Sequence, residues 1–404
     1  MAKYSNLREL FTDIANAIRN KTGLTESIAA SDFPYLINTI GAEQSTDTKP
    51  DTNYTQLKPL LYDIAEAIRS KTGRQDKIIA DNFPEAIENI VASFLTGTTW
   101  TQSNITSGRF RTVQNANGIW VTGTDKLGLY YSTDGKTWTQ SNITSMSFAS
   151  VCYANGIWVA GSNSSKAIYY STDGMTWTKC SITSTTFESV YNDNGIWVAG
   201  SGSKTGLYYS TDGKTWTQSS VTSGNFANVH YADGTWVACS SSNGGIYYSA
   251  DGKTWMQSNI TSGYFEVIHN ANGLWVIGTN YLGIYYSIDG KTWTQSNVTS
   301  GFFGAIYYAN GIWIAGSSLG YGLYYSTDGM TWTKNDTTSI SIASIQNANG
   351  IWIAGNGTDH GLYYSTDGMT WVQSNIDTFA FESVQYANGI WVACSDNGLY
   401  YSVS

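Results

Sequence analysis

Charged residues are scarce in this chain of 404 residues, and proline and cysteine are scarcer still. Lys, Arg, Asp and Glu together make up 13% of the sequence, which has only 4 prolines and 4 cysteines. So little charge argues against disorder and against a coiled coil. The formal net charge is −9, and after residue 97 only 11 basic residues stand against 17 acidic ones. With no basic face, we expect no nucleic-acid partner.

Long apolar runs and metal-ligand patterns are also missing. No stretch of 18 apolar residues occurs, so we expect no membrane span. Three histidines and four widely spaced cysteines match no metal-ligand or nucleophile pattern, and we expect no metal or other cofactor. The cysteines are interpreted as small, buried, unpaired residues. They are Cys152, Cys180, Cys239 and Cys394.

A repeated motif dominates what is present, together with 41 glycines and 14% aromatic residues. The first copy is Ser132-Thr133-Asp134-Gly135-Lys136-Thr137-Trp138, preceded by a Tyr-Tyr pair, and near-copies return every 38 or 39 residues. A fixed period of this length indicates a repeat architecture. The other copies are Ser171–Trp177, Ser210–Trp216, Ser249–Trp255, Ser287–Trp293, Ser326–Trp332 and Ser365–Trp371.

A second motif keeps the same period but occurs eight times. It is Asn117-Gly118-Ile119-Trp120 in the first repeat and begins with Asn or Asp in the others. The chain ends at Tyr400-Tyr401-Ser402, before an eighth copy of the first motif, while residues 98–103 resemble the missing fragment. An open solenoid would need distinct capping repeats. Complementary ends predict instead an eight-bladed β-propeller over residues 98–404, with residues 98–103 supplying the last strand.

Four short strands are expected in each repeat, and therefore in each blade. In the first repeat they are 110–115, 119–122, 129–132 and 137–140, with Asn-Gly and Asp-Gly turns between them. The second and third strands do not alternate between polar and apolar residues, so we expect both of their faces to be buried. All 16 tryptophans fall at two fixed positions of the repeat, and they and the Tyr-Tyr pairs are predicted to lie in the core.

The Ser-Thr-Asp-Gly-Lys-Thr-Trp motif resembles the Asp-box of sialidase-like and other propellers, in a form one residue shorter between Asp and Trp. The resemblance implies a structural role, in which the Asp carboxylate accepts hydrogen bonds from turn amides and the Trp packs between blades. Sialidases bind their substrate with three arginines. Residues 98–404 contain only Arg109 and Arg111, so sialidase activity is rejected.

The first 95 residues contain a duplication with an offset of 50 residues. Residues 1–45 form one predicted helical repeat with its linker, and residues 54–95 form the second. The run Asp13–Gly23, followed by Asp32-Phe33-Pro34, resembles helical segments repeated in tail proteins of phages of Gram-positive bacteria. The resemblance implies a docking or stalk role, with other particle proteins as partners and a possible homo-oligomer. Small helical spacers are the alternative.

Two columns of the repeat vary strongly, and both belong to loops that should emerge on one face of the ring. The Asn-Gly and Asp-Gly turns should emerge on the other face and hardly vary. Loops drift when nothing restrains them, but aromatic and charged groups gathered there suit a binding surface. The candidate binding residues are Arg109, Arg111, Asp125, Lys126, Tyr264, Tyr281, Phe302, Tyr321 and His360.

Catalysis has weak support in the sequence. Glu188, Glu266 and Glu382 share one repeat column, and a carboxylate pair across the ring would suit a glycan-cleaving enzyme. His230 and His269 share another column but lack a third metal ligand.

We therefore expect a non-enzymatic receptor-binding protein of a phage tail or tail-like particle, whose propeller binds a bacterial surface glycan or protein. The alternatives are a bacterial lectin or adhesin and, third, the enzyme. The start of the chain, Met1–Asn6, lacks the apolar segment of a secretory signal. The expected location is thus the virion, after synthesis in the bacterial cytoplasm.

Overall fold

The computed structural model describes residues 97–182, 185–317, 322–335, 341–358 and 360–403. The two predicted helical repeats, residues 1–45 and 54–95, lie outside this part of the chain, as does Tyr321. Within the described residues, no helix is long and apolar enough to cross a membrane.

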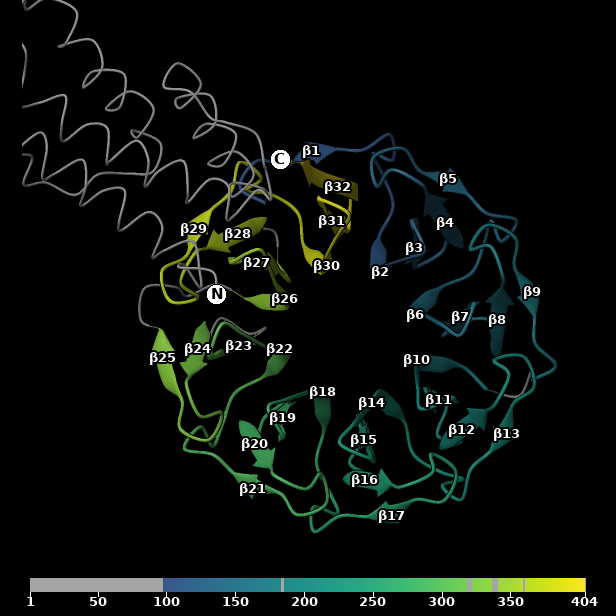
Figure 1. Cartoon of the computed structure of the whole chain (residues 1–404), viewed down its shortest axis with the longest axis vertical. Helices are drawn as coiled ribbons and strands as arrows, with labels where there is room; N and C mark the ends of the chain where they lie inside the picture. The colour runs from purple at the N-terminus through teal and green to yellow at the C-terminus, as the bar shows by residue number, and fades with distance from the viewer. Residues whose placement is uncertain (1–96, 183–184, 318–321, 336–340, 359, 404) are drawn as a thin grey trace, which may run out of the picture. The chain divides into compact units, whose positions relative to one another are not determined.

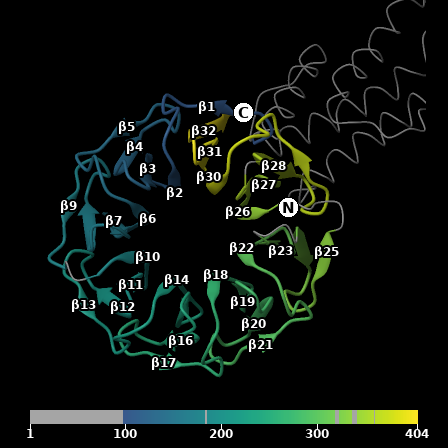
Figure 2. The same ribbon diagram turned by 180° about the vertical axis from the view of Figure 1, so that it is seen from behind.

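The described chain folds into eight four-stranded antiparallel sheets arranged around a central axis (Figures 1 and 2). The eight-bladed β-propeller predicted from the repeat is confirmed. In each blade the first strand of the repeat lies innermost and the fourth lies at the rim, as Figure 1 shows.

The strands at the four positions of the blades have nearly constant lengths. The innermost strands are β2 (Phe110–Ala116), β6 (Phe148–Ala154), β10 (Phe187–Asp193), β14 (Phe226–Ala232), β18 (Phe265–Ala271), β22 (Phe303–Ala309), β26 (Ile342–Ala348) and β30 (Phe381–Ala387). The second strands are β3 (Ile119–Thr124), β7 (Ile157–Ser162), β11 (Ile196–Ser201), β15 (Thr235–Ser240), β19 (Leu274–Thr279), β23 (Ile312–Ser317), β27 (Ile351–Asn356) and β31 (Ile390–Ser395).

The two outer positions carry shorter strands. The third strands are β4 (Leu129–Ser132), β8 (Ala167–Ser171), β12 (Leu207–Ser210), β16 (Ile246–Ser249), β20 (Ile284–Ser287), β24 (Leu323–Ser326), β28 (Leu362–Ser365) and β32 (Gly398–Val403). The rim strands are β5 (Thr139–Gln140), β9 (Thr178–Lys179), β13 (Thr217–Gln218), β17 (Met256–Gln257), β21 (Thr294–Gln295), β25 (Thr333–Asn335), β29 (Val372–Gln373) and β1 (Thr101–Gln102).

The expectation that the second and third strands are buried on both faces is only half right. The second strand of the first blade, β3, is buried along nearly its whole length, but β4 has two half-buried tyrosines in its centre. A rim strand of two residues is too short to cover the third strand. The second tyrosine of each Tyr-Tyr pair is accordingly half-buried and does not lie in the core.

The first strand of the propeller closes the ring by completing the last blade. β1 pairs with β32, with Thr101 opposite Tyr401. The Gly97 amide donates to the Ser402 hydroxyl (N···O 2.8 Å), just as the Gly135 amide donates to the Ser132 hydroxyl (2.9 Å) in the first blade. The two ends of the propeller thus rebuild the eighth turn motif across a break in the chain.

In the continuous copies of the motif, the Asp carboxylate organises the turn. Asp134 Oδ1 accepts hydrogen bonds from the amides of Lys136 (2.8 Å) and Thr137 (2.7 Å) and from the Ser132 hydroxyl (2.8 Å). Burial acts to raise the pKa of Asp134, but these hydrogen bonds lower it overall. Gly135 has a φ of 70°, which favours glycine. These contacts supply the structural role that was expected of the motif.

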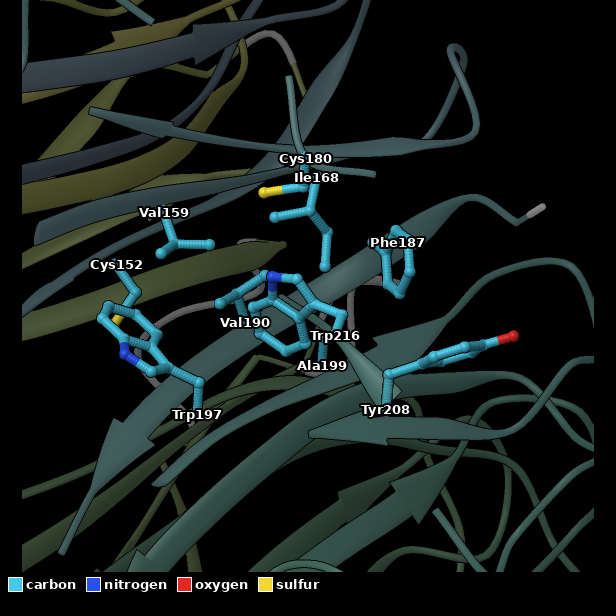
Figure 3. Packing of buried hydrophobic residues seen from close by; sticks show 10 residues of the cluster. All are labelled: Cys152, Val159, Ile168, Cys180, Phe187, Val190, Trp197, Ala199, Tyr208 and Trp216. Atoms are coloured by element: carbon cyan, nitrogen blue, oxygen red, sulfur yellow. The ribbon is translucent and has the colours of Figure 1, made fainter. Parts of the chain in front are cut away.

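The core lies between blades, where apolar residues of neighbouring sheets interdigitate. Figure 3 shows one such cluster, in which Cys152 and Ile168 of the second blade pack with Phe187, Trp197 and Trp216 of the third. All 16 tryptophans are buried, at most 8% exposed, as predicted. The four cysteines are also buried and unpaired. Burial raises the pKa of the Cys152 thiol to about 12, so it is not a nucleophile.

Trp100 should be as important for stability as the tryptophans of the continuous blades. It is 3% exposed, its indole N–H donates to the Gly97 carbonyl (2.6 Å), and Asn375 holds its backbone on both sides. We expect Trp100→Ala and Trp138→Ala each to lower the free energy of unfolding by about 3–5 kcal/mol. Chemical denaturation measures both. Met256→Ala, at an exposed rim position, is the control, and a neutral Trp100→Ala would contradict closure by this segment.

Candidate functional site

Both variable columns of the repeat do lie on one face of the ring. In seven of the eight blades, a residue of the loop between the second and third strands is hydrogen-bonded to the segment leading into the innermost strand; the loop of the sixth blade lies outside the described residues. The Asp125 amide donates to the Arg109 carbonyl (3.0 Å), and the Asn280 amide donates to the Tyr264 carbonyl (3.0 Å). We call this side the loop face and the side of the Asn-Gly and Asp-Gly turns the turn face.

Four charged groups of the loop face lie at bulges of the innermost strands. A β-bulge interrupts the pairing between Phe110 and Thr112 in β2, and bulges occur at the equivalent places of β10, β18 and β30. A bulge re-aims the side chain of its extra residue. The residues at these four places are Arg111, Glu188, Glu266 and Glu382.

Arg109 and Arg111 lie together, as predicted, but acidic groups neutralise both. Arg109 is bonded to Glu382 and lies 3.6 Å from Asp125. Arg111 is bonded to Asp125 and lies 3.7 Å from Glu382. Burial acts to lower the pKa of Arg111, but Asp125 and Glu382 raise it overall. This network joins the first blade to the last, and Lys126 is exposed beside it.

The aromatic candidates lie on the fifth and sixth blades, where they differ in exposure. Tyr281 is 67% exposed and Tyr264 is 45% exposed, and the adjacent Leu282 is 40% exposed. Leu282 pairs with Gly301 of the sixth blade, which places Phe302 beside it, although Phe302 is half-buried. We call Tyr264, Tyr281 and Leu282 the aromatic patch. His360 is exposed on the seventh blade, and no contact joins it to this patch.

Two polar residues beside the aromatic patch were not among the predicted binding residues. Asn280 precedes Tyr281. Burial raises the pKa of Glu266, and hydrogen bonding from the Asn280 side chain opposes that rise. The Oδ1 atom of Asn280 is buried and has no hydrogen-bond partner in the described part of the chain. The signal for Asn280 was its place in the same variable loop. The sequence presents Glu266 only as a candidate catalytic carboxylate.

The histidines of the innermost strands form part of an aromatic arc. The ring centroids of His230 and His269 lie 6.3 Å apart and the rings stack, with Tyr191 and Tyr307 beyond them on either side. Burial lowers the pKa of both histidines to about 4, so they are neutral at pH 7. In the described residues, no group of three or more His, Cys, Asp or Glu side chains could hold a metal ion.

Comparison with known proteins relates this chain to others through its fold. No protein-family model and no curated protein matches the sequence. Among solved structures, the computationally designed Ika8 protein is similar with a TM-score of 0.61 and 11% identity, over 76% of this chain and 100% of that one.

Natural propellers are also similar. YCF48 bound to D1 peptide has a TM-score of 0.52 and 14% identity, over 76% of this chain and 96% of that one. Virginiamycin B lyase from Staphylococcus aureus has a TM-score of 0.52 and 8% identity, over 63% and 94%. At such low identity these likenesses show the β-propeller alone. Since the fold serves a peptide-binding protein and an enzyme alike, it does not decide between binding and catalysis.

The stacked histidines predict a loss of stability in mild acid. Their folded-state pKa of about 4 lies below the ordinary value of 6.5, so the unfolded chain binds more protons between these pH values. The contribution of the two neutral histidines to the free energy of unfolding is fully present above pH 6.5 and is lost as the pH falls toward 4. We expect about 1–2 kcal/mol per histidine to be lost between pH 7 and pH 5.

Urea denaturation at the two pH values measures this effect. Gln occupies the same repeat position at Gln114, Gln346 and Gln385, so His230→Gln with His269→Gln should fold and should flatten the pH dependence. The Asp carboxylates of the turns have lowered pKa values, about 2 for Asp212, so their titration does not contribute to the change between pH 7 and pH 5. If the double variant lost as much stability between pH 7 and pH 5 as the natural protein, the two histidines would not be the cause of the pH dependence.

Proposed function

We propose that this protein is a non-enzymatic receptor-binding protein whose loop face binds a component of the bacterial surface. The observation that carries the proposal is the exposure of the aromatic patch on the diversified face. Tyrosine side chains that are 67% and 45% exposed contribute little to the core, and aromatic residues are common anchors of binding surfaces.

The backbone of the loop face supports binding over random drift. Drift is expected where the chain is unrestrained, but the same amide-to-carbonyl hydrogen bond recurs between the two variable columns. It joins Asn163 to Ser147 (3.2 Å), and Gly202 to Thr186 and Ser241 to Asn225 (both 3.0 Å). A fixed backbone that presents changing side chains is the arrangement of a recognition surface on a rigid scaffold.

The position of Gly97 supports separate roles for the two faces. Gly97 takes the place of the turn glycine in the last blade, so the described part of the chain begins on the turn face. The loop face is the opposite side. We propose that the predicted helical repeats dock on a phage tail or tail-like particle, and that the mature protein is a virion component.

Removal of the aromatic patch tests the binding face. Tyr264→Ala with Tyr281→Ala should lower attachment to Gram-positive host cells at least about tenfold, because exposed anchors each contribute about 1–2 kcal/mol. The melting temperature should not change, since neither side chain is buried. Binding of labelled protein to a panel of cells, with thermal melts in parallel, measures both effects.

Two controls accompany this experiment. Lys136→Ala with Lys214→Ala changes one half-buried and one exposed lysine of the turn face and should leave attachment unchanged. Trp313→Ala removes a residue that is 2% exposed and should unfold the protein instead. If the lysine variant loses attachment and the tyrosine variant keeps it, the binding face is the turn face.

The predicted helical repeats should be needed for particle assembly and not for attachment. A chain shortened to residues 91–404 should bind cells like the full chain but should be missing from purified particles. Immunoblots of particles from cells that produce each form provide the measurement. Incorporation of the shortened chain at the normal level would refute the docking role.

A further inference from the structure

The fifth blade brings the aromatic patch together with two hydrogen-bonding side chains. Glu266 follows Tyr264 by two residues at the start of β18, and Asn280 precedes Tyr281 in the loop after β19. The hydrogen bond from the Asn280 amide to the Tyr264 carbonyl (3.0 Å) holds the two segments side by side. Aromatic and polar groups therefore share one rigid surface on one blade.

The acceptor that this surface offers to a ligand is the carboxylate of Glu266, which is only half-buried. A hydrogen bond from the side chain of Asn280 opposes the effect of burial on the pKa of Glu266. Asn280 therefore positions the carboxylate, while its own Oδ1 atom is buried and out of a ligand's reach.

The charge of Glu266 also lacks a basic partner in the described chain. No salt bridge involves Glu266 in the described chain, whereas Glu382, at the same place in its blade, is bonded to Arg109 and lies near Arg111. Glu188 differs from both, because the positive charge of Arg111 lowers the pKa that burial raises. Of the three carboxylates at the bulges, Glu266 alone meets no basic group and adjoins exposed aromatic rings.

We propose that Glu266, positioned by Asn280 and flanked by Tyr264 and Tyr281, binds a glycan that has no acidic groups. This inference rests on the proposed function and names the chemistry of its receptor. Sugar hydroxyls donate to the Glu266 carboxylate, and the apolar face of a sugar ring stacks on tyrosine. Acidic glycans are excluded, because an unpaired carboxylate repels them. An amino sugar satisfies the same acceptor as a neutral one.

An array of immobilised oligosaccharides in neutral, amino-substituted and acidic groups tests the inference with the full-length protein. Binding is expected to neutral or amino-substituted members and to no acidic member. Glu266→Gln should weaken the binding about tenfold or more, since it removes a charged hydrogen-bond acceptor. Asn280→Ala should weaken the binding less, since it removes only the side chain that positions the carboxylate. Glu266→Gln should also admit acidic members that the natural protein rejects.

The matched control is Glu188→Gln, the same change at the same bulge position on a blade without exposed tyrosines, and its binding should be unchanged. Glu266→Ala guards against a folding defect, because Ala149 and Ala227 already occupy this repeat position. A preference for acidic glycans, equal binding by the Glu266 variants, or no glycan binding would each overturn the inference. The cell-attachment experiment tests the proposed function independently of the glycan array. If the tyrosine variants lose cell attachment, the proposed function stands even when the glycan inference fails. If they attach normally, the proposed function is wrong.

Discussion

Packing between blades is the constraint on which the structure depends. A four-stranded sheet with two apolar faces is stable only when a neighbour covers each face, so every blade needs a blade on both sides. The chain meets this requirement by closing on itself. β1 completes the blade formed by β30, β31 and β32, and Val392, Cys394 and Leu399 of that blade pack with residues of the first.

That constraint explains why the repeats agree where they do. The tryptophans fill the spaces between blades and the Asp carboxylates hold the turns, so changes there would affect a core or a hydrogen-bonded turn. Side chains of the loop face are less constrained, because the hydrogen bond that recurs there joins two backbone atoms. Only some of them, such as Ser164 and Ser242, also accept a hydrogen bond from a backbone amide. The ring thus leaves eight sets of loop positions free to differ, and the aromatic patch occupies one of them.

Electrostatics divide the loop face into two parts. Around the junction of the first and last blades, two arginines and two acidic residues neutralise one another. On the fifth blade, Glu266 keeps its charge without a basic neighbour, and burial raises its pKa. A charge that is already paired within the protein contributes little to the binding of a new partner. The fifth blade is therefore the better candidate for recognition.

The sequence by itself determined the number of blades, the closing segment and the two buried tryptophan positions, because the spacing of a repeat records the spacing of its blades. It also identified the loop face, since strand direction alternates along each blade. Only the tertiary structure decided which loop residues are exposed, paired or buried. Arg109 meets Glu382 across 273 positions of the chain, and Phe302 is half-buried beside Leu282. Such contacts form between blades and depend on bulges, which no pattern within a single repeat specifies.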